Sequence, residues 1–355
     1  MTAEPTTARD PRAASAPRTP RLGIALTGGG MSLAQLVALG QRAERAGIYG
    51  IYLTEAWRSA WIPLAALASA TKRVRLGPYV LNAYGHSPFL TAMSAVDFDE
   101  LCGGRLLLGV GGGNRIINEE WQGIPHERVL TKMGEYVALL RQAARTHAGE
   151  RIDFDGQVHR MHWSPAIEPR SRPFPVYLAA IFPRMVRVAG RSADGLACGA
   201  LLSADYLREV IRPAAADAAA DAGRDPRALG FMTGILSAVD EDRERARHAA
   251  RAAICSLFAP LPHPYYEFAL REQGHSAVAD AALRCAPSGD FSAAVAAIPD
   301  SCLDRLALAG TPDECRKRLA DYAGAVDELV LTNVLPPRGD DPSEAFDGLL
   351  SLARG

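Results

Sequence analysis

Two polar residues in the first hundred positions have side chains suited to acid–base chemistry. Glu55 follows the short apolar run 51–54, and His86 precedes Ser87. A carboxyl group and an imidazole can each hold or transfer a proton when their surroundings tune them. Trp57 lies close behind Glu55, so this acid could also help to orient a flat ring. The alternatives are a solvent-exposed salt bridge for Glu55 and simple loop packing for His86, and the sequence leaves them open.

A glycine-rich run follows a later apolar segment. Residues 109–114 read Gly-Val-Gly-Gly-Gly-Asn, at the end of the run 106–110. No Gly-Lys-Ser/Thr follows, so the run is not a P-loop. Glycines let a flat ligand approach the backbone closely, or they serve a tight turn that needs positive φ. Asn118 and Glu119 add polar groups to the same predicted loop.

A third candidate lies where an apolar run gives way to a helical pattern. Residues 179–184 read Ala-Ala-Ile-Phe-Pro-Arg. Free backbone N–H groups and the positive end of a helix can hold a phosphate at such a junction. Arg184 and Arg187 could add positive charge. Most strand-to-helix junctions in a barrel bind nothing, so this pattern alone does not establish a phosphate site.

Several other chemistries lack support. His159 and His162 are three residues apart, but no cluster of histidines or acids completes a metal-ligand set, so we expect no metal. No Gly-x-Ser-x-Gly motif indicates an esterase triad. The 6 cysteines are scattered without a Cys-x-x-Cys pair, which favours reduced thiols and a cytoplasmic location.

The composition is that of an ordinary globular protein. The 355 residues are 48% hydrophobic and 22% charged, and the net charge is −1. No global basic field attracts nucleic acid or acidic lipid, and no apolar run reaches the roughly 20 residues of a membrane span. We therefore expect a small-molecule substrate, with no nucleic-acid or membrane partner. The proline-rich residues 1–20 are expected to form a disordered tail.

From Arg21 onward, apolar runs alternate with helical patterns. Helical patterns cover 33–46, 61–70, 88–101, 125–147, 184–191, 204–222 and 243–258. Eight strand candidates lie at 22–27, 51–54, 74–81, 106–110, 175–179, 195–198, 231–239 and 328–332. This alternation predicts an α/β fold with a parallel sheet, and eight strands close naturally into a (β/α)8 TIM barrel. The alternative is an open dinucleotide-binding sheet. In such a sheet the glycine-rich turn would follow the first strand, whereas here it follows the fourth.

The remaining chain adds three features to one predicted barrel domain, 21–355. Residues 152–163 alternate around Asp155-Gly156 and predict a hairpin. Prolines interrupt the pattern between 259 and 299, which indicates an insertion. Residues 311–314 read Thr-Pro-Asp-Glu, a capping box that begins the helix before the last strand. In a barrel, functional groups lie on the loops after the strands, where the candidates above are expected.

Taken together, these segments resemble the luciferase-like monooxygenase superfamily, and within it the branch of oxidoreductases that depend on coenzyme F420. The resemblance rests on AERAG (43–47), IYLTE (51–55), TKRVRLG (71–77), NAYGHSP (82–88), GRLLLGVG (104–111), PVYLAA (175–180), AGRSADG (189–195) and AGTPDE (309–314). The stretches occur in the family's order and cover the chain from about Arg21 to Asn333.

The resemblance implies a flavin or deazaflavin at the carboxyl end of the barrel, without a metal. It also implies a non-prolyl cis peptide at Tyr79–Val80, beneath the central ring of the cofactor. By position, the residues that would line the ring and ribityl chain are Thr54, Glu55, Asn82, Gly111, Gly112 and Asn118. The residues that would meet the phosphate are Ala179, Ala180, Ile181 and Phe182, with Arg184 adding charge. Coenzyme F420 is the expected cofactor, FMN is the alternative, and family habit implies a homodimer.

The sequence departs from the family after the second strand. Several F420-dependent relatives have a histidine directly after the acid, whereas this chain has Glu55-Ala56. A proton would then come from Glu55, from His86 or from water. The leading hypothesis is an F420-dependent oxidoreductase that exchanges a hydride with a small organic substrate. The alternatives are an FMN-dependent monooxygenase that uses reduced flavin and dioxygen, and a non-catalytic flavin-binding relative.

Overall fold

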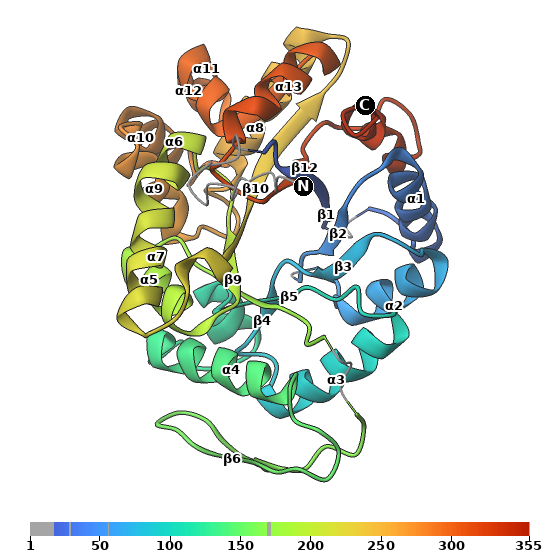
Figure 1. Ribbon diagram of the computed structural model, residues 1–355. Coiled ribbons are helices and arrows are strands. Elements are labelled where there is room, and N and C mark those ends of the chain that lie inside the picture. The colour runs from blue at the N-terminus through green and yellow to red at the C-terminus, as the bar shows by residue number, and fades with distance from the viewer. Residues whose placement is uncertain (1–17, 28–29, 56, 169–171, 355) are drawn as a thin grey trace, which may run out of the picture.

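A barrel of parallel strands lies at the centre of the molecule, with helices around it (Figure 1). The computed structural model describes residues 18–354 except 28–29, 56 and 169–171. The barrel strands are β1 (Arg21–Leu26), β2 (Gly50–Leu53), β3 (Arg75–Pro78), β4 (Leu81–Asn82), β5 (Leu108–Gly111), β8 (Val176–Ala179), β9 (Gly195–Cys198), β10 (Gly230–Val239) and β12 (Glu328–Asn333). They neighbour one another in the order β3-β2-β1-β12-β10-β9-β8-β5-β4. A bridge between Leu76 and Leu106 brings β3 beside the start of β5 and closes the circle.

The third strand of the barrel is interrupted. The sequence predicts one strand over 74–81, but the cis peptide Tyr79–Val80 separates β3 from β4, as the family resemblance implied. With β3 and β4 counted as one strand, the nine strands of the circle become eight, and the predicted TIM barrel is confirmed. We call the end where the strands finish the mouth and the opposite end the floor.

The outer helices are α1 (Leu33–Ala46), α2 (Trp61–Ala70), α3 (Pro88–Leu101), α4 (Val129–Ala143), α5 (Pro183–Ser192), α7 (Arg212–Asp221), α8 (Arg243–Ser256), α13 (Pro312–Arg318) and α14 (Asp347–Ser351). Local signals set many of their ends. Ser32 and Gln35 form a capping box before α1, and Gly47 ends this helix with a φ of 93°. Thr311 and Glu314 form the predicted capping box of α13. Each such cap stabilises its helix by about 1 kcal/mol.

Two predicted helices differ in the structure, and one strand was not predicted. Helix α4 begins at Val129 instead of residue 125, because Arg128 has a left-handed φ of 50°. The helix predicted over 204–222 is divided into α6 (Ala204–Tyr206), the π-helical η2 (Leu207–Ile211) and α7. A further strand, β11 (Ala307–Gly310), pairs with β10 outside the circle. Its four-residue apolar run has no alternation that would have revealed it.

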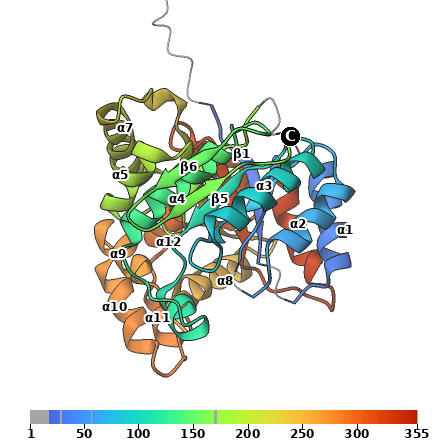
Figure 2. The same ribbon diagram turned by 90° about the horizontal axis from the view of Figure 1, so that it is seen from below.

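Two excursions leave the barrel. The predicted hairpin forms from β6 (Ile152–Asp155) and β7 (Arg160–Trp163), which project beyond α4 at the bottom of Figure 1. The insertion after α8 contains α9 (Pro264–Glu272), α10 (Ser276–Cys285) and α11 (Ser292–Ala297), at the lower left of Figure 2, and α12 (Asp300–Leu306) follows. Most of the predicted tail, 1–17, lies outside the described residues. No helix in the described part of the chain is long and apolar enough to cross a membrane.

Side chains fill the inside of the barrel below the mouth. The inner cluster consists of Ala25, Tyr52, Leu107, Ala197, Met232 and Val330, with Tyr79, Val80 and Tyr177 packed against it. Glycines make room for the large members of the floor. A Cβ added at Gly230 would lie 1.6 Å from Tyr177 Oη, and one added at Gly50 would lie 2.5 Å from Glu328 Oε1. The floor is therefore closed by packing, and a ligand must approach from the mouth.

Candidate active site at the barrel mouth

The loops after β2 and β4 bring the two predicted acid–base residues together. His86 Nε2 lies 2.9 Å from Glu55 Oε2. The side chains of Glu55 and His86 are 14% and 30% exposed, so solvent and small molecules can reach the pair. Thr54 precedes them and still donates its N–H to the carbonyl of Leu26, 3.1 Å away, which extends the β1–β2 ladder to the mouth. The sequence named both residues but did not predict their contact.

Glu55 is held as an anion. Burial alone would raise its pKa, but the hydrogen bond and charge of His86 and the N–H groups of Asn82 and Ala60 outweigh that effect, so the pKa lies below its usual value. The N–H of Asn82 donates to Oε2 at 3.2 Å, and that of Ala60 to Oε1 at 3.5 Å. Because an ionised carboxylate only accepts hydrogen bonds, His86 donates its Nε2–H to Glu55. The other ring nitrogen, Nδ1, is then free to exchange a proton.

A chain of amides connects this pair to the glycine-rich loop. Asn82 Nδ2 donates to Asn118 Oδ1 at 2.7 Å. Asn118 is completely buried, and its Nδ2 lies 2.8 Å from both the carbonyl of Gly112 and His126 Nδ1. Removing either amide would leave buried polar atoms without partners. The network therefore holds the β4 loop, the glycine-rich loop and His126 in fixed relation.

His126 and its neighbours were not found in the sequence. The His126 ring stacks on Tyr84, with centroids 4.7 Å apart, and Lys132 Nζ lies 3.9 Å from the centroid of the Tyr84 ring. Burial lowers the pKa of His126 and raises the pKa of Tyr84 to about 12. Thus a neutral imidazole and a neutral phenol line this side of the mouth near pH 7. His126 lies in an irregular segment without a motif, so no local pattern could have revealed it.

The glycines meet steric demands that other residues cannot. A Cβ at Gly111 would lie 2.7 Å from Val80 Cγ2 and 3.0 Å from the Cβ of Ala179. A Cβ at Gly113, where φ is 67°, would lie 2.6 Å from Asn82 Oδ1. Gly111 therefore admits the Val80 side chain between β5 and β8. The predicted ligand residues 80, 82, 111, 112 and 118 are thereby brought together.

The side chain of Tyr79 lies in the barrel interior, whereas the family resemblance implied a ligand role for the Tyr79–Val80 peptide. Its hydroxyl donates to the carbonyl of Cys198, and its ring lies 6.2 Å from that of Tyr52 inside the barrel. Burial raises its pKa well above the ordinary value. The side chain of Tyr79 therefore supports the barrel interior, and only the backbone at Tyr79–Val80 is available to border a ligand.

The junction between β8 and α5 offers a place for an anion. Ala180 continues the β8–β9 ladder, whereas no hydrogen bond among the described residues uses the N–H groups of Ile181 or Phe182. Phe182 occupies the N-cap position of α5 and Ala179 is the last residue of β8. The exposed Arg184 has no ion pair or hydrogen bond in the described part of the chain. Unused N–H donors, a helix N-terminus and a nearby unpaired guanidinium together suit a phosphate group.

The insertion is tied to two loops of the mouth. Asn114 Nδ2 donates to the carbonyl of Pro262 at 3.3 Å. Gln273 donates to the carbonyl of Leu201 at 2.7 Å and accepts from the N–H of Ser203 at 2.8 Å. Leu201 has a φ of 68°, which residues other than glycine seldom adopt. Gln273 thus holds the loop after β9 in an unusual conformation from a segment in which the sequence showed no motif.

The insertion also brings aromatic groups to the mouth. A Cβ at Gly199, just after β9, would lie 2.8 Å from Tyr265 Oη. His263 packs edge-on against Tyr265, with ring centroids 5.0 Å apart, and burial lowers its pKa. These two residues, like His126, were missed because the fold alone brings them near the glycine-rich loop and β9.

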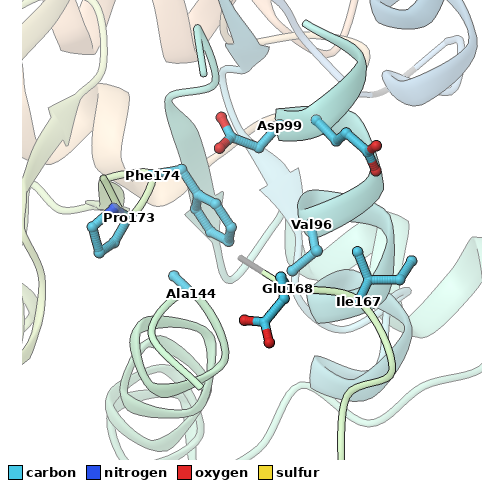
Figure 3. Close-up of a pocket in the computed structure, with 8 residues that line it drawn as sticks. Val96, Asp99, Ala144, Ile167, Glu168, Pro173 and Phe174 are labelled. Carbon is cyan, nitrogen blue, oxygen red and sulfur yellow. The ribbon is translucent and has the colours of Figure 1, made fainter. Parts of the chain in front are cut away.

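Another cavity has a volume of about 420 Å³ (Figure 3). It is lined by Val96, Asp99, Glu100, Ala144, Ile167, Glu168, Pro173 and Phe174. None of these residues belongs to the group around Glu55 and His86. In the described part of the chain, no three His, Cys, Asp or Glu side chains are grouped as a metal site.

A parallel barrel whose polar side chains gather at the carboxyl ends of its strands is the architecture of an enzyme that binds its ligands there. A model of the luciferase-like monooxygenase family matches residues 14–328, and the chain belongs to this family of oxidoreductases, as its sequence pattern indicated.

Named relatives refine this assignment. The chain is 30% identical over 300 residues to a 5,10-methylenetetrahydromethanopterin reductase of Archaeoglobus fulgidus, which covers 83% of this chain and 88% of the relative. It is 29% identical over 244 residues to an F420-dependent glucose-6-phosphate dehydrogenase of Gordonia bronchialis, which covers 64% and 69%. The solved F420-dependent tetrahydromethanopterin reductase of Methanopyrus kandleri superimposes with a TM-score of 0.76 at 21% identity, over 95% of this chain and 98% of that one.

Proposed function

We propose that the protein is a coenzyme F420-dependent oxidoreductase that exchanges a hydride with a small organic substrate at the barrel mouth. The observation that carries this proposal is the 2.9 Å contact between His86 Nε2 and Glu55 Oε2 at the carboxyl ends of the strands. The names of relatives that depend on F420 support the choice of cofactor.

The residues at the mouth suit such a cofactor. When bound, F420 supplies or accepts a hydride at its deazaflavin ring. The unused N–H groups of Ile181 and Phe182 would hold its phosphate, and Arg184 would add charge. The amide network of Asn82 and Asn118 would keep the glycine-rich loop open for the ring. Because the floor is filled by side chains, the ring has access only from the mouth.

The Glu55–His86 pair would handle the proton. Hydride addition to the carbon of a polar double bond leaves an electron pair on the heteroatom, and this atom must take up one proton. Glu55 accepts the Nε2–H of His86 and so orients the ring, and the proton passes from Nδ1 of protonated His86 to the heteroatom, which leaves neutral imidazole. In the oxidation direction, neutral His86 accepts the proton from the substrate hydroxyl or amine. A pair of this kind replaces the histidine that several relatives have after the acid.

The cofactor can be tested by direct titration. Purified full-length protein is titrated with F420 and with FMN, and quenching of intrinsic fluorescence is measured. We expect saturable binding of F420 and at least tenfold weaker binding of FMN. Binding of FMN without a response to F420 would overturn the proposal and favour a flavin monooxygenase. Failure to bind either compound at micromolar concentration would favour a non-catalytic relative.

A further inference from the structure

Two tryptophans stand exposed at the rim of the mouth. The side chains of Trp57 and Trp121 are 64% and 48% exposed, and their ring centroids lie 5.3 Å apart with planes inclined by 51°. The other two tryptophans pack against phenylalanine rings: Trp61 against Phe98, and Trp163 against Phe89. Adjacent exposed aromatic side chains from different loops are uncommon in a globular protein unless they meet a ligand or partner.

Both tryptophans are on loops that carry or contact the acid–base pair. Trp57 comes two residues after Glu55. Trp121 ends the π-helical turn η1 (Ile117–Trp121), and the next residue, Gln122, packs on the loop of His86: a Cβ at Gly85 would lie 2.6 Å from Gln122 Oε1. The other end of η1 is fixed by the hydrogen bond between the Asn82 and Asn118 amides. The loop carrying Trp121 is therefore anchored at both ends against the loop carrying His86.

The geometry of the pair favours a flat ring as ligand. With planes inclined by 51°, the two indoles form an open wedge that offers a face and an edge. Aromatic rings prefer offset-stacked or edge-to-face contacts, and a conjugated ring can make both in such a wedge. A cation could also lie over an indole face, and titration with choline distinguishes it from a flat ring.

We propose that Trp57 and Trp121 bind a flat, conjugated ring of the substrate and thereby place the reacting atoms next to His86. The inference rests on the proposed function, since it names the substrate class of that same site. It predicts that the protein prefers compounds with a conjugated ring over saturated compounds of equal size and charge.

The preference is measured with a matched pair of probes. Naphthalene-2-carboxylate is flat and conjugated, whereas decahydronaphthalene-2-carboxylate has the same size and charge without a conjugated ring. Both are titrated by calorimetry into the full-length protein and into the variants W57L and W121L, with W163L as a control outside the wedge. We expect the naphthalene compound to bind at least tenfold more tightly to the parent protein. The ratio should fall to within twofold of one in W57L and W121L and stay unchanged in W163L.

A conservative variant and a cationic ligand provide further tests of the inference. The variant W121F, which keeps a ring, should recover most of the preference. An unchanged ratio in both leucine variants, the absence of a preference in the parent, or tighter binding of choline than of the naphthalene compound would overturn the inference.

The same variants are titrated with F420, because the cofactor also carries a flat ring. Unchanged F420 affinity in W57L and W121L supports a substrate role, and an equal loss for F420 overturns it. If the parent protein does not bind F420, the proposed function fails, while the probe ratio still reports on the two tryptophans.

Discussion

The mouth and the floor of the barrel each contain a buried or half-buried glutamate, and their surroundings shift the two pKa values in opposite directions. Glu55 at the mouth accepts from His86 and from two backbone N–H groups, and its pKa lies below the usual value. Burial raises the pKa of Glu328 at the floor to about 7. The contrast indicates that hydrogen-bond donors, and not burial alone, determine which carboxyl group is an anion at neutral pH.

The floor lacks the donors that the mouth supplies. Glu328 is 3% exposed, and in the described part of the chain neither its Oε1 nor Tyr52 Oη has a hydrogen-bond partner. The charges of Arg75 and Arg21 counteract only part of the effect of burial on the pKa of Glu328. Thus one glutamate is organised for proton transfer with a partner, and the other fills space in a closed end of the barrel.

The largest expected effect is on catalysis at the mouth. His86→Ala should lower kcat by about 10²- to 10⁴-fold, the usual contribution of a positioned acid or base, because the product loses its proton donor. Affinity for F420 should change less than threefold. Steady-state kinetics on any substrate that the parent protein turns over measures the effect. His147, which pairs with Glu168 at 2.9 Å on the surface, gives the matched control H147A. Parent-like turnover by H86A would remove the assigned role.

The next effect is on stability and belongs to the floor. A raised folded-state pKa means that Glu328 favours the folded state fully below its ordinary pKa of 4.5, and that this stability is lost as pH rises towards about 7. The shift corresponds to on the order of 3 kcal/mol at 1.36 kcal/mol per pKa unit. Urea unfolding between pH 4.5 and 8 should show this loss in the parent protein.

The variant E328Q isolates this contribution. Its glutamine cannot ionise, so the stability loss between pH 4.5 and 7 should become much smaller, whereas the exposed control E244Q should behave as the parent does. The contribution of Glu55 to stability depends on pH in the opposite direction. Because its pKa is lowered in the folded state, this contribution is present above its ordinary pKa and is lost as pH falls through the folded-state pKa. An E328Q profile as steep as that of the parent would contradict the contrast between the two ends.

A smaller effect is expected in the amide network. Asn118→Ala leaves the Asn82 amide and the Gly112 carbonyl without buried partners, which should destabilise the fold by about 1–3 kcal/mol. It should also weaken F420 binding, because the glycine-rich loop loses its anchor. The matched variant N114A removes a partly exposed amide and should cost less. Equal losses in the two variants, measured by urea unfolding, would argue against a special role for the buried network.

The smallest effect concerns the phosphate. Arg184→Ala should weaken F420 binding by about 1 kcal/mol, or several-fold, because an exposed charge contributes modestly. The loss should shrink at high salt, and a deazaflavin without the phosphate should bind the variant and the parent protein equally. Arg191, in the last turn of the same helix, provides the control R191A. An effect that is independent of both salt and phosphate would place the anion elsewhere.

The sequence predicted the parts of this molecule that local patterns encode. Parallel strands buried on both faces form apolar runs, and caps such as that of Thr311 mark helix ends, so the barrel could be recognised. Glu55 and His86 were separate candidates, since only the path of the chain after β4 brings them into contact. Glu328 looked like an ordinary first residue of a strand. Its isolation depends on Gly23 and Gly50 of neighbouring strands, which no local pattern reports.

The most direct test of the account is a crystal structure of the protein with F420. We predict the deazaflavin ring at the mouth, above the Tyr79–Val80 peptide and beside the Glu55–His86 pair, with the phosphate about 3 Å from the N–H groups of Ile181 and Phe182. A ring bound elsewhere, or a phosphate that does not contact the junction between β8 and α5, would contradict it.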